Sequence, residues 1–165
     1  MTSWIKMKTP KVAVIIPCYK VEKTIAEVIR KIPSFVEWII CVNDCSPDGT
    51  MAKIQAVTDE RVTLISHAKN QGVGGAMLTG YSYALQKGAD VLVKIDGDDQ
   101  MDPNYMNCLI NPIINHEAEY VKGNRFMHPL ELRRMPWLRK IGNLGLTFLT
   151  KIASGYWNIF DPTNG

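Results

Sequence analysis

A dense group of carboxylates follows an apolar run near the middle of the chain. The stretch KIDGDDQMDP, residues 94–103, contains four aspartates and comes directly after the apolar residues VLV. Carboxylates this close repel one another, and a bound divalent cation is a common way to compensate them. Asp96 and Asp98 lie two residues apart, so in extended chain both side chains fall on one side and can reach one point. The pattern predicts a divalent-cation site with Asp96 and Asp98 as ligands.

Other interpretations of this acidic stretch are weaker. Aspartates are also common in turns, so an isolated D-x-D would carry little information, whereas D-G-D-D-Q directly after an apolar strand carries more. An EF-hand loop needs glycine at its sixth position and glutamate at its end. Met101 stands at the sixth position here, and no glutamate closes the loop. An EF-hand is therefore excluded.

The elements that must position these carboxylates alternate between strand and helix. Short β-branched runs predict strands at 11–16, 37–43, 61–66, 90–96 and 118–123. Apolar residues at helical spacing predict helices at 23–32, from the turn 46–50 to about Val57, and at 76–88, where Gly88 would end the helix. Pro103 can open a further helix. Such alternation predicts right-handed βαβ units and an α/β fold with a mostly parallel sheet flanked by helices.

Polar and glycine-rich segments follow four of the expected strands. They are residues 17–19, 43–48, 67–75 and 96–102. In parallel sheets, ligands bind beyond the carboxyl ends of the strands. We therefore expect these four segments to form one binding site.

The segment NQGVGGA, residues 70–76, is the strongest glycine motif. Gly72 and Gly74 match the first two glycines of a dinucleotide fingerprint, but Met77 occupies the third position, and no G-K-[ST] follows for a P-loop. A nicotinamide oxidoreductase is therefore disfavoured. Two interpretations remain: a tight turn whose exposed amides lie near the site, or a plain packing turn.

Asp44 in CVNDCSPDGT ends the second expected strand. The favoured interpretation from the residues alone is a capped turn. A carboxylate at this place could instead accept a hydrogen bond from a nucleobase or a ribose. The three histidines share no spacing, and no Ser/His/Asp or Cys/His arrangement is apparent.

The formal charge of +3 is unevenly distributed. From residue 121 onward, seven Lys/Arg stand against two acidic residues, whereas residues 1–120 hold twelve basic and fourteen acidic residues. This asymmetry favours a cation in the first part and an anionic partner near the second, with solvated surface charge as the alternative. In the basic part, the apolar segment 134–160 has tryptophans near its ends, which is typical of a helix in a lipid interface or of an ordinary core helix.

The cysteines and the terminus bear on the compartment. The four cysteines show no paired framework and no zinc spacing, which fits a reducing compartment. Residues 1–11 lack an apolar core of signal-peptide length, and no uncharged apolar run reaches the roughly 18 residues of a membrane span. We expect a cytoplasmic chain that can still touch a membrane.

Five motifs together resemble a known family. In chain order they are VAVIIPCYKVEKTI, CVNDCSPDGT, NQGVGGA, KIDGDDQMDP and GNRF with FDPTNG. They are similar to the family 2 glycosyltransferases with the GT-A fold, a Rossmann-like fold, and most of all to the polyprenyl-phosphate type that includes dolichol-phosphate mannosyltransferase. The resemblance spans residues 11–165, which would form the glycosyltransferase domain, and residues 1–10 would be an N-terminal extension.

The resemblance implies a nucleotide-sugar donor and a divalent metal. Asp96 and Asp98 would hold Mn²⁺ or Mg²⁺ on the donor diphosphate, with Gln100 as a further ligand. Asp44 would contact the base, in place of the capped turn. The remaining residues expected around the donor are Pro17, Tyr19, Glu22 and Gly72.

The acceptor implied by the resemblance is a lipid phosphate. Its oxygen is already ionised at neutral pH, so no general base is needed. Arg125 and Arg139 would hold this phosphate, segment 134–160 would lie on the acceptor side, and Asp98, Arg125 and Arg139 are the expected catalytic residues. The implied activity is inverting transfer of a sugar from a UDP- or GDP-linked donor to a polyprenyl phosphate at the cytoplasmic face of the membrane. Nucleic acid is not an expected partner.

Two alternatives stay open: a family 2 enzyme with a sugar hydroxyl acceptor in polysaccharide synthesis, and a non-catalytic module that binds a nucleotide or a membrane. The sequence also departs from the family pattern. Asp99 stands where an apolar residue is frequent, and Gln71 stands where a basic residue is frequent. The DPTNG motif usually lies inside the catalytic domain, with further elements and often membrane spans after it. We therefore expect the domain to be incomplete at its C-terminus.

Overall fold

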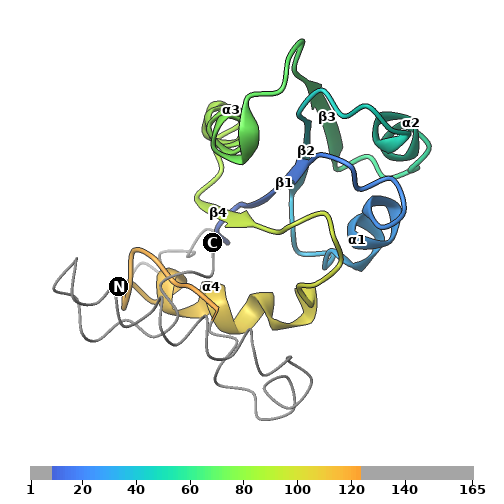
Figure 1. Ribbon diagram of the computed structural model, residues 1–165. Helices are drawn as coiled ribbons and strands as arrows, with labels where there is room; N and C mark the ends of the chain where they lie inside the picture. The colour runs from blue at the N-terminus through green and yellow to red at the C-terminus, as the bar shows by residue number, and fades with distance from the viewer. Residues whose placement is uncertain (1–8, 124–165) are drawn as a thin grey trace, which may run out of the picture. The chain divides into compact units, whose positions relative to one another are not determined.

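The computed structural model of the protein describes residues 9–123. Strands and helices alternate along this part of the chain, and all of them lie in one compact unit that ends at Glu119 (Figure 1). The elements are β1 (Val12–Cys18), α1 (Ile25–Lys31), β2 (Trp38–Asn43), α2 (Thr50–Gln55), β3 (Val62–Ser66), α3 (Gly72–Gln86), β4 (Val91–Lys94), the 3₁₀ turn η1 (Pro103–Tyr105) and α4 (Met106–Ile114).

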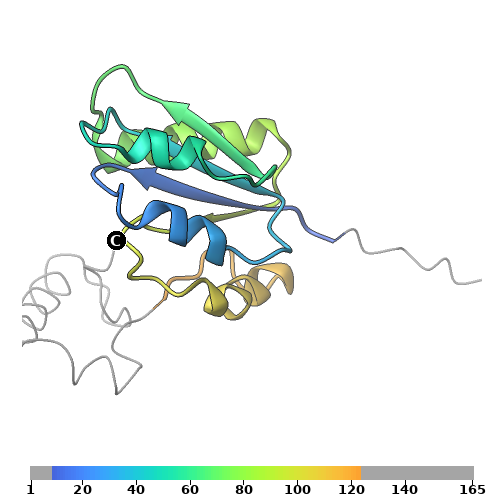
Figure 2. The same ribbon diagram turned by 90° about the vertical axis from the view of Figure 1, so that its right-hand side faces the viewer.

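The four strands form one parallel sheet in the order β3-β2-β1-β4. Ile15 of β1 pairs with Ile40 of β2 on one side and with Lys94 of β4 on the other. The apolar runs of β1 and β2 are buried along most of their length, as expected for strands covered on both faces. Because all strands are parallel, their carboxyl ends meet at one edge of the sheet (Figure 2).

Helices cover both faces of this sheet. Helix α3 packs on one face, where Ala76, Met77 and Ala84 join a buried cluster with side chains of β1 and β2. Helices α1, α2 and α4 contribute to the larger cluster on the other face (Figures 1 and 2). At Gly80, an added Cβ would collide with the Ile15 side chain, so the absence of a side chain lets α3 approach β1 closely.

The predicted α/β fold with a parallel sheet is confirmed. The first four predicted strands are present, although β4 ends at Lys94, two residues before its predicted end. Gly88 has a φ of 80° directly after α3, as the predicted helix stop requires. Helix α3 starts at Gly72 rather than at residue 76, so the glycines form its first turn and not a connection before it.

The predicted fifth strand at 118–123 is wrong. The structure has no strand there, and Tyr120 is 78% exposed. A strand needs a neighbouring backbone as well as β-forming residues, and within residues 9–123 β4 pairs only with β1. None of the helices in this described range is long and apolar enough to cross a membrane. The four cysteines are free thiols, as their spacing predicts.

Candidate active site

A pocket of about 400 Å³ opens at the carboxyl edge of the sheet. It is lined by Pro17, Cys18, Tyr19, Val21, Asp44, Asn70, Gly72, Val73, Ala76, Asp96, Gly97 and Asp98. Six of the predicted site residues are in this set: Pro17, Tyr19, Asp44, Gly72, Asp96 and Asp98. The loops after all four strands therefore supply the predicted site or its immediate surroundings, as the parallel sheet requires.

The strand order explains why the pocket forms at this place. The chain moves from β1 outward to β2 and β3, and then returns through α3 to place β4 on the other side of β1. Such a reversal creates a crevice at the carboxyl ends of the two strands between which it occurs. The loops after β1 and β4 lie at this crevice, and the first turn of α3 borders it.

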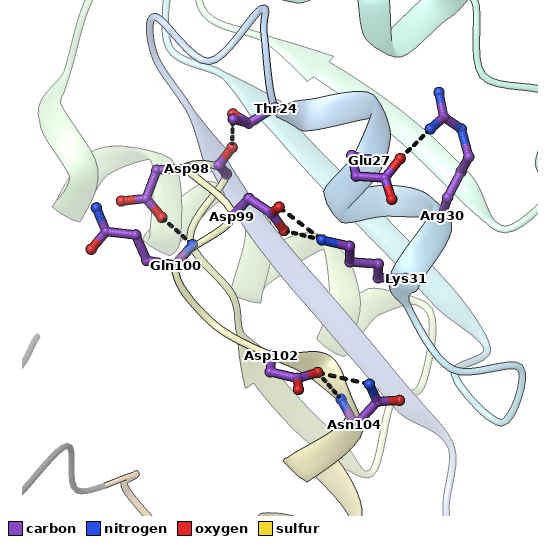
Figure 3. Close-up of polar contacts among 10 residues, drawn as sticks. Thr24, Glu27, Arg30, Lys31, Asp98, Asp99, Gln100, Asp102 and Asn104 are labelled. Atoms are coloured by element: carbon purple, nitrogen blue, oxygen red, sulfur yellow. Dashed lines mark hydrogen bonds and ion pairs between the residues drawn. The ribbon is translucent and has the colours of Figure 1, made fainter. Parts of the chain in front are cut away.

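Of the four clustered aspartates, only Asp96 and Asp98 line the pocket. An Asp96 oxygen lies 3.2 Å from Lys94 Nζ, and Asp98 Oδ1 accepts a hydrogen bond of 3.1 Å from the Gln100 amide. The loop is also held by Thr24, whose hydroxyl donates to the Gly97 carbonyl at 2.6 Å (Figure 3). Both carboxylates are therefore held at the mouth of one pocket.

The other two aspartates have structural partners. Asp99, in a left-handed conformation with φ of 63°, accepts hydrogen bonds from Lys31 Nζ at 2.9 and 2.8 Å (Figure 3). The hydrogen bond to Asp99 raises the pKa of Lys31. Asp102 accepts a hydrogen bond from the Asn104 amide at 3.0 Å and so caps η1. Asp99, which departs from the family pattern, thus has a structural role: through Lys31 it connects the acidic loop to the end of α1.

The residues at the pocket fit a hard divalent cation that is shared with a substrate. In the described part of the chain, no group of three or more His, Cys, Asp or Glu could hold a metal ion by itself. Two carboxylates fit the usual Mg²⁺ arrangement, in which substrate phosphates and water supply the other ligands. Gln100 is not among the pocket-lining residues, so its role as a ligand stays a prediction.

Asp44 is a buried carboxylate with several donors around it. Its side chain is 4% exposed, and Oδ1 accepts hydrogen bonds from the Gln71 amide at 2.9 Å and from His67 Nδ1 at 2.7 Å. Burial acts to raise the pKa of Asp44, but the hydrogen bonds from Gln71 and His67 outweigh it and hold the pKa below its ordinary value. Asp44 does not cap α2, whose N-cap is Gly49, so the capped-turn interpretation is wrong for Asp44. Within the same turn, Asn43 and Asp48 do accept hydrogen bonds from the Ser46 and Thr50 amides.

His67 is the residue that sequence reasoning missed. Its Nε2 lies 2.9 Å from the Thr79 hydroxyl of α3, which completes a chain of contacts from Asp44 through His67 to Thr79. The three residues are 23 and 12 positions apart, so no local spacing connects them. The only sequence signal was that Asp44 and His67 each follow a strand of one parallel sheet.

Glu22 does not line the pocket but belongs to a polar network that joins the loops after β1 and β2. Its Oε2 accepts a hydrogen bond from the Gly49 amide at 2.7 Å, and Ser46 Oγ accepts one from the Lys20 amide at 2.8 Å. Asp48 accepts from the Ser46 hydroxyl and the Thr50 amide. Burial acts to raise the pKa of Asp48, but these hydrogen bonds outweigh it and lower the pKa to about 2. The loops after β1 and β2 are thus joined by a polar network, and a direct role of Glu22 toward a nucleoside stays a prediction.

Several predicted features lie outside the described residues. They are Arg125, Arg139, segment 134–160, the FDPTNG motif and most of the expected N-terminal extension. The expectations about the acceptor side of the site therefore depend on the sequence alone.

Comparison with known sequences gives the family. The model of the family described as "Glycosyl transferase family 2" matches residues 13–165. The UDP-N-acetylglucosamine–dolichyl-phosphate N-acetylglucosaminyltransferase of Methanococcus voltae is 37% identical over 92% of this chain and 66% of its own length. The undecaprenyl-phosphate mannosyltransferase of Micrococcus luteus is 28% identical over 94% of this chain and 64% of its own length. The chain thus spans about two thirds of the length of these relatives.

Solved structures agree on the fold. Glucosyl-3-phosphoglycerate synthase from Mycobacterium tuberculosis, in complex with Mn²⁺, UDP-glucose and phosphoglyceric acid, superposes with a TM-score of 0.53 at 22% identity, covering 66% of this chain and 40% of that one. Mannosyl-3-phosphoglycerate synthase from Rubrobacter xylanophilus gives 0.53 at 20% identity, covering 63% of this chain and 36% of that one. At this identity the likeness supports the fold alone, and it is the GT-A fold. Together with the match over residues 13–165, this shows that the chain belongs to glycosyl transferase family 2.

Proposed function

We propose that the protein is a metal-dependent, inverting glycosyltransferase that moves a sugar from a UDP- or GDP-linked donor to a polyprenyl phosphate. The observation that carries this proposal is the pocket that gathers Asp44 from the end of β2 and Asp96 and Asp98 from the end of β4. Membership of glycosyl transferase family 2 supports the reaction class. The names of the relatives from Methanococcus voltae and Micrococcus luteus support a polyprenyl-phosphate acceptor.

The diphosphate of the donor is proposed to bind between the acidic loop and the start of α3. Asp96 and Asp98 would hold Mn²⁺ or Mg²⁺ there, with Gln100 as a proposed further ligand. A bound cation neutralises the negative charge that develops on the departing nucleoside diphosphate. Gly72 and Val73, in the first turn of α3, line the same pocket. The positive end of the helix dipole at this turn favours a phosphate group.

The nucleoside is proposed to bind next to Asp44 and Tyr19. Asp44 supplies a carboxylate that is held ionised, which suits an N–H donor on a base. Tyr19 is 44% exposed beside Pro17, so its ring and the proline offer apolar surface for a planar ligand.

The acceptor is proposed to be a lipid phosphate that needs no general base. Its oxygen would attack the anomeric carbon on the side opposite the departing diphosphate, so the bond to the diphosphate oxygen breaks and the configuration inverts. Arg125 and Arg139 would hold the phosphate in line, because guanidinium groups bind phosphate in a bidentate manner. Segment 134–160 would lie in the lipid interface at the cytoplasmic face of the membrane.

The test is an assay of sugar transfer to lipid. The protein is incubated with radiolabelled UDP-sugars or GDP-sugars, Mn²⁺ and a polyprenyl phosphate in detergent, and the label in the organic phase is counted. In the presence of Mn²⁺ we expect one of the donors to transfer its label to the lipid. In the presence of EDTA we expect none of them to do so. Label on an added oligosaccharide, but not on the lipid, would replace the proposed acceptor with a sugar hydroxyl. Donor binding without transfer to any acceptor would favour a non-catalytic module.

A further inference from the structure

A chain of side-chain contacts connects the pocket to Thr79 in α3. It runs from the Asp44 carboxylate to His67 Nδ1 at 2.7 Å, and from His67 Nε2 to the Thr79 hydroxyl at 2.9 Å. The side chains of His67 and Asp44 are only 7% and 4% exposed. The His67 amide also donates to the Asn43 carbonyl at 2.9 Å, so the backbone that carries the imidazole is fixed against β2.

The chemistry of the carboxylate decides the direction of the first contact. An ionised carboxylate only accepts hydrogen bonds, so His67 Nδ1 carries a hydrogen and donates the hydrogen bond to Asp44 Oδ1. The Thr79 hydroxyl, which can donate or accept, lies within hydrogen-bond distance of Nε2 on the other side of the ring. Thr79 therefore restrains the ring in the orientation in which Nδ1 faces Asp44.

Two hydrogen-bond donors limit the rotation of the Asp44 side chain. The Gln71 amide donates to Oδ1 at 2.9 Å from the loop before α3, and His67 donates to the same oxygen. A buried carboxylate that loses such a donor must find another or change its rotamer. Because Asp44 also lines the pocket, a change in its rotamer would alter the surface that a ligand meets.

We propose that His67 is a positioning residue for the donor nucleoside: it holds the Asp44 carboxylate in the orientation in which this group binds the base, and Thr79 holds His67. The inference rests on the proposed function, since it takes Asp44 as the group that contacts the nucleoside. It predicts an effect on nucleoside binding that is separate from diphosphate binding, because His67 bonds to Asp44, Thr79 and Asn43, and not to the acidic loop of residues 96–99 or to the first residues of α3.

Two substitutions of nearly equal size separate positioning from packing. The amide nitrogen of Asn can occupy the place of His Nδ1, whereas that of Gln occupies the place of Nε2. His67→Asn therefore keeps a donor for Asp44, and His67→Gln removes it. We expect His67→Gln to weaken the binding of the nucleoside diphosphate by roughly tenfold to hundredfold, which is typical for a hydrogen bond to a charged group, and His67→Asn to weaken it by less than about threefold.

The experiment is titration calorimetry with Mn²⁺ on the wild-type protein and both variants, with UDP, GDP and inorganic pyrophosphate as the probes. The expected result is that His67→Gln weakens only the binding of the nucleotide, leaves that of pyrophosphate unchanged, and is rescued in His67→Asn. Equal nucleotide binding in His67→Gln and the wild type would overturn the inference alone. A parallel loss of nucleotide and pyrophosphate would also overturn it, since His67 would then merely support the fold. If the wild type binds neither nucleotide, the proposed function itself fails and the inference fails with it.

Discussion

The two sides of the pocket are constructed differently. On the β2–β3 side, Asp44 is buried, and the protein itself supplies its hydrogen bonds through His67 and the Gln71 amide. On the β4 side, Asp98 is exposed, and Asp96 is partly exposed and faces Lys94. One carboxylate is thus fixed by the fold, whereas the other two lie in a loop that can accept a cation.

From this difference we infer that the two sides of the pocket have different roles. A carboxylate that already accepts hydrogen bonds from the protein would lose them if its rotamer changed. It therefore suits recognition of a rigid base. Carboxylates that keep contact with water suit an ion that arrives and leaves with each substrate. We therefore expect substitutions on the β4 side to affect turnover with little effect on stability, and substitutions on the β2–β3 side to affect stability and nucleoside binding.

The largest expected effect is at Asp98. Asp98→Asn should lower kcat by about 10³-fold, because the proposed metal site loses a charge that matters most as the diphosphate departs. The melting temperature should stay within about 2 °C, since Asp98 is exposed and its Oδ1 partner is the nearby Gln100 amide. Asp102→Asn is the matched control, because Asp102 caps η1 outside the pocket. A fully active Asp98→Asn protein would refute the proposed role.

On the opposite side, Asp44→Ala should cost about 3 kcal/mol of unfolding free energy, because it leaves His67 and the Gln71 amide without their buried acceptor. Urea unfolding followed by circular dichroism measures this change. Asp98→Ala, studied in parallel, should lose less than about 0.5 kcal/mol. Equal losses of unfolding free energy in the two variants would contradict the proposed difference between the two sides of the pocket.

The polar network after β2 should give stability that depends on pH. The pKa of Asp48 is lowered from 3.8 to about 2 by its hydrogen bonds from Ser46, Thr50 and Glu22, although burial opposes this shift. A lowered pKa in the folded state means that the stabilisation is complete above about pH 4 and is lost as the pH falls toward 2. We expect Asp48→Asn to lose about 1–2 kcal/mol at pH 6 and to match the wild type near pH 2. A difference that stays constant from pH 6 to pH 2 would show that the hydrogen bonds do not depend on the charge.

The smallest expected effect is at the ion pair between Lys31 and Asp99. Lys31→Ala should leave the melting temperature nearly unchanged, because the lysine side chain is 42% exposed. Loss of this contact should loosen the acidic loop, so we expect binding of the nucleotide with Mn²⁺ to weaken by roughly twofold to fivefold in calorimetry. Binding without metal should not change, and a loss in both conditions would mean that Lys31 acts on the nucleoside side.

Much of the architecture follows from local pattern. The β-branched runs and helical spacings predicted five strands, of which four form the parallel sheet. The rule that ligands bind at strand ends predicted that Asp44, Asp96 and Asp98 lie at one site, and all three line the pocket. Residues 118–123 show the limit of this reasoning. Their composition suits a strand, but no strand in the described range pairs with them.

The contacts that fix the site could not be predicted, because they join distant positions. Lys31 and Asp99 are 68 residues apart, and Thr24 reaches the Gly97 carbonyl over 73 residues. His67 pairs with Asp44 only because β2 and β3 are neighbours in register, with Asn43 opposite Ser66. Such pairings depend on strand order and register, and neither is present in the spacing of a single sequence.

The central claim is that Asp96 and Asp98 bind the donor diphosphate through a divalent cation. Its most direct test is calorimetric titration of the wild-type protein and of Asp98→Asn with UDP and with GDP, each in Mn²⁺ and in EDTA. We expect one of the two nucleotides to bind the wild-type protein at least about tenfold more tightly with Mn²⁺, and Asp98→Asn to lose this gain while it stays folded. Equal affinity of the wild type in Mn²⁺ and in EDTA would contradict the central claim.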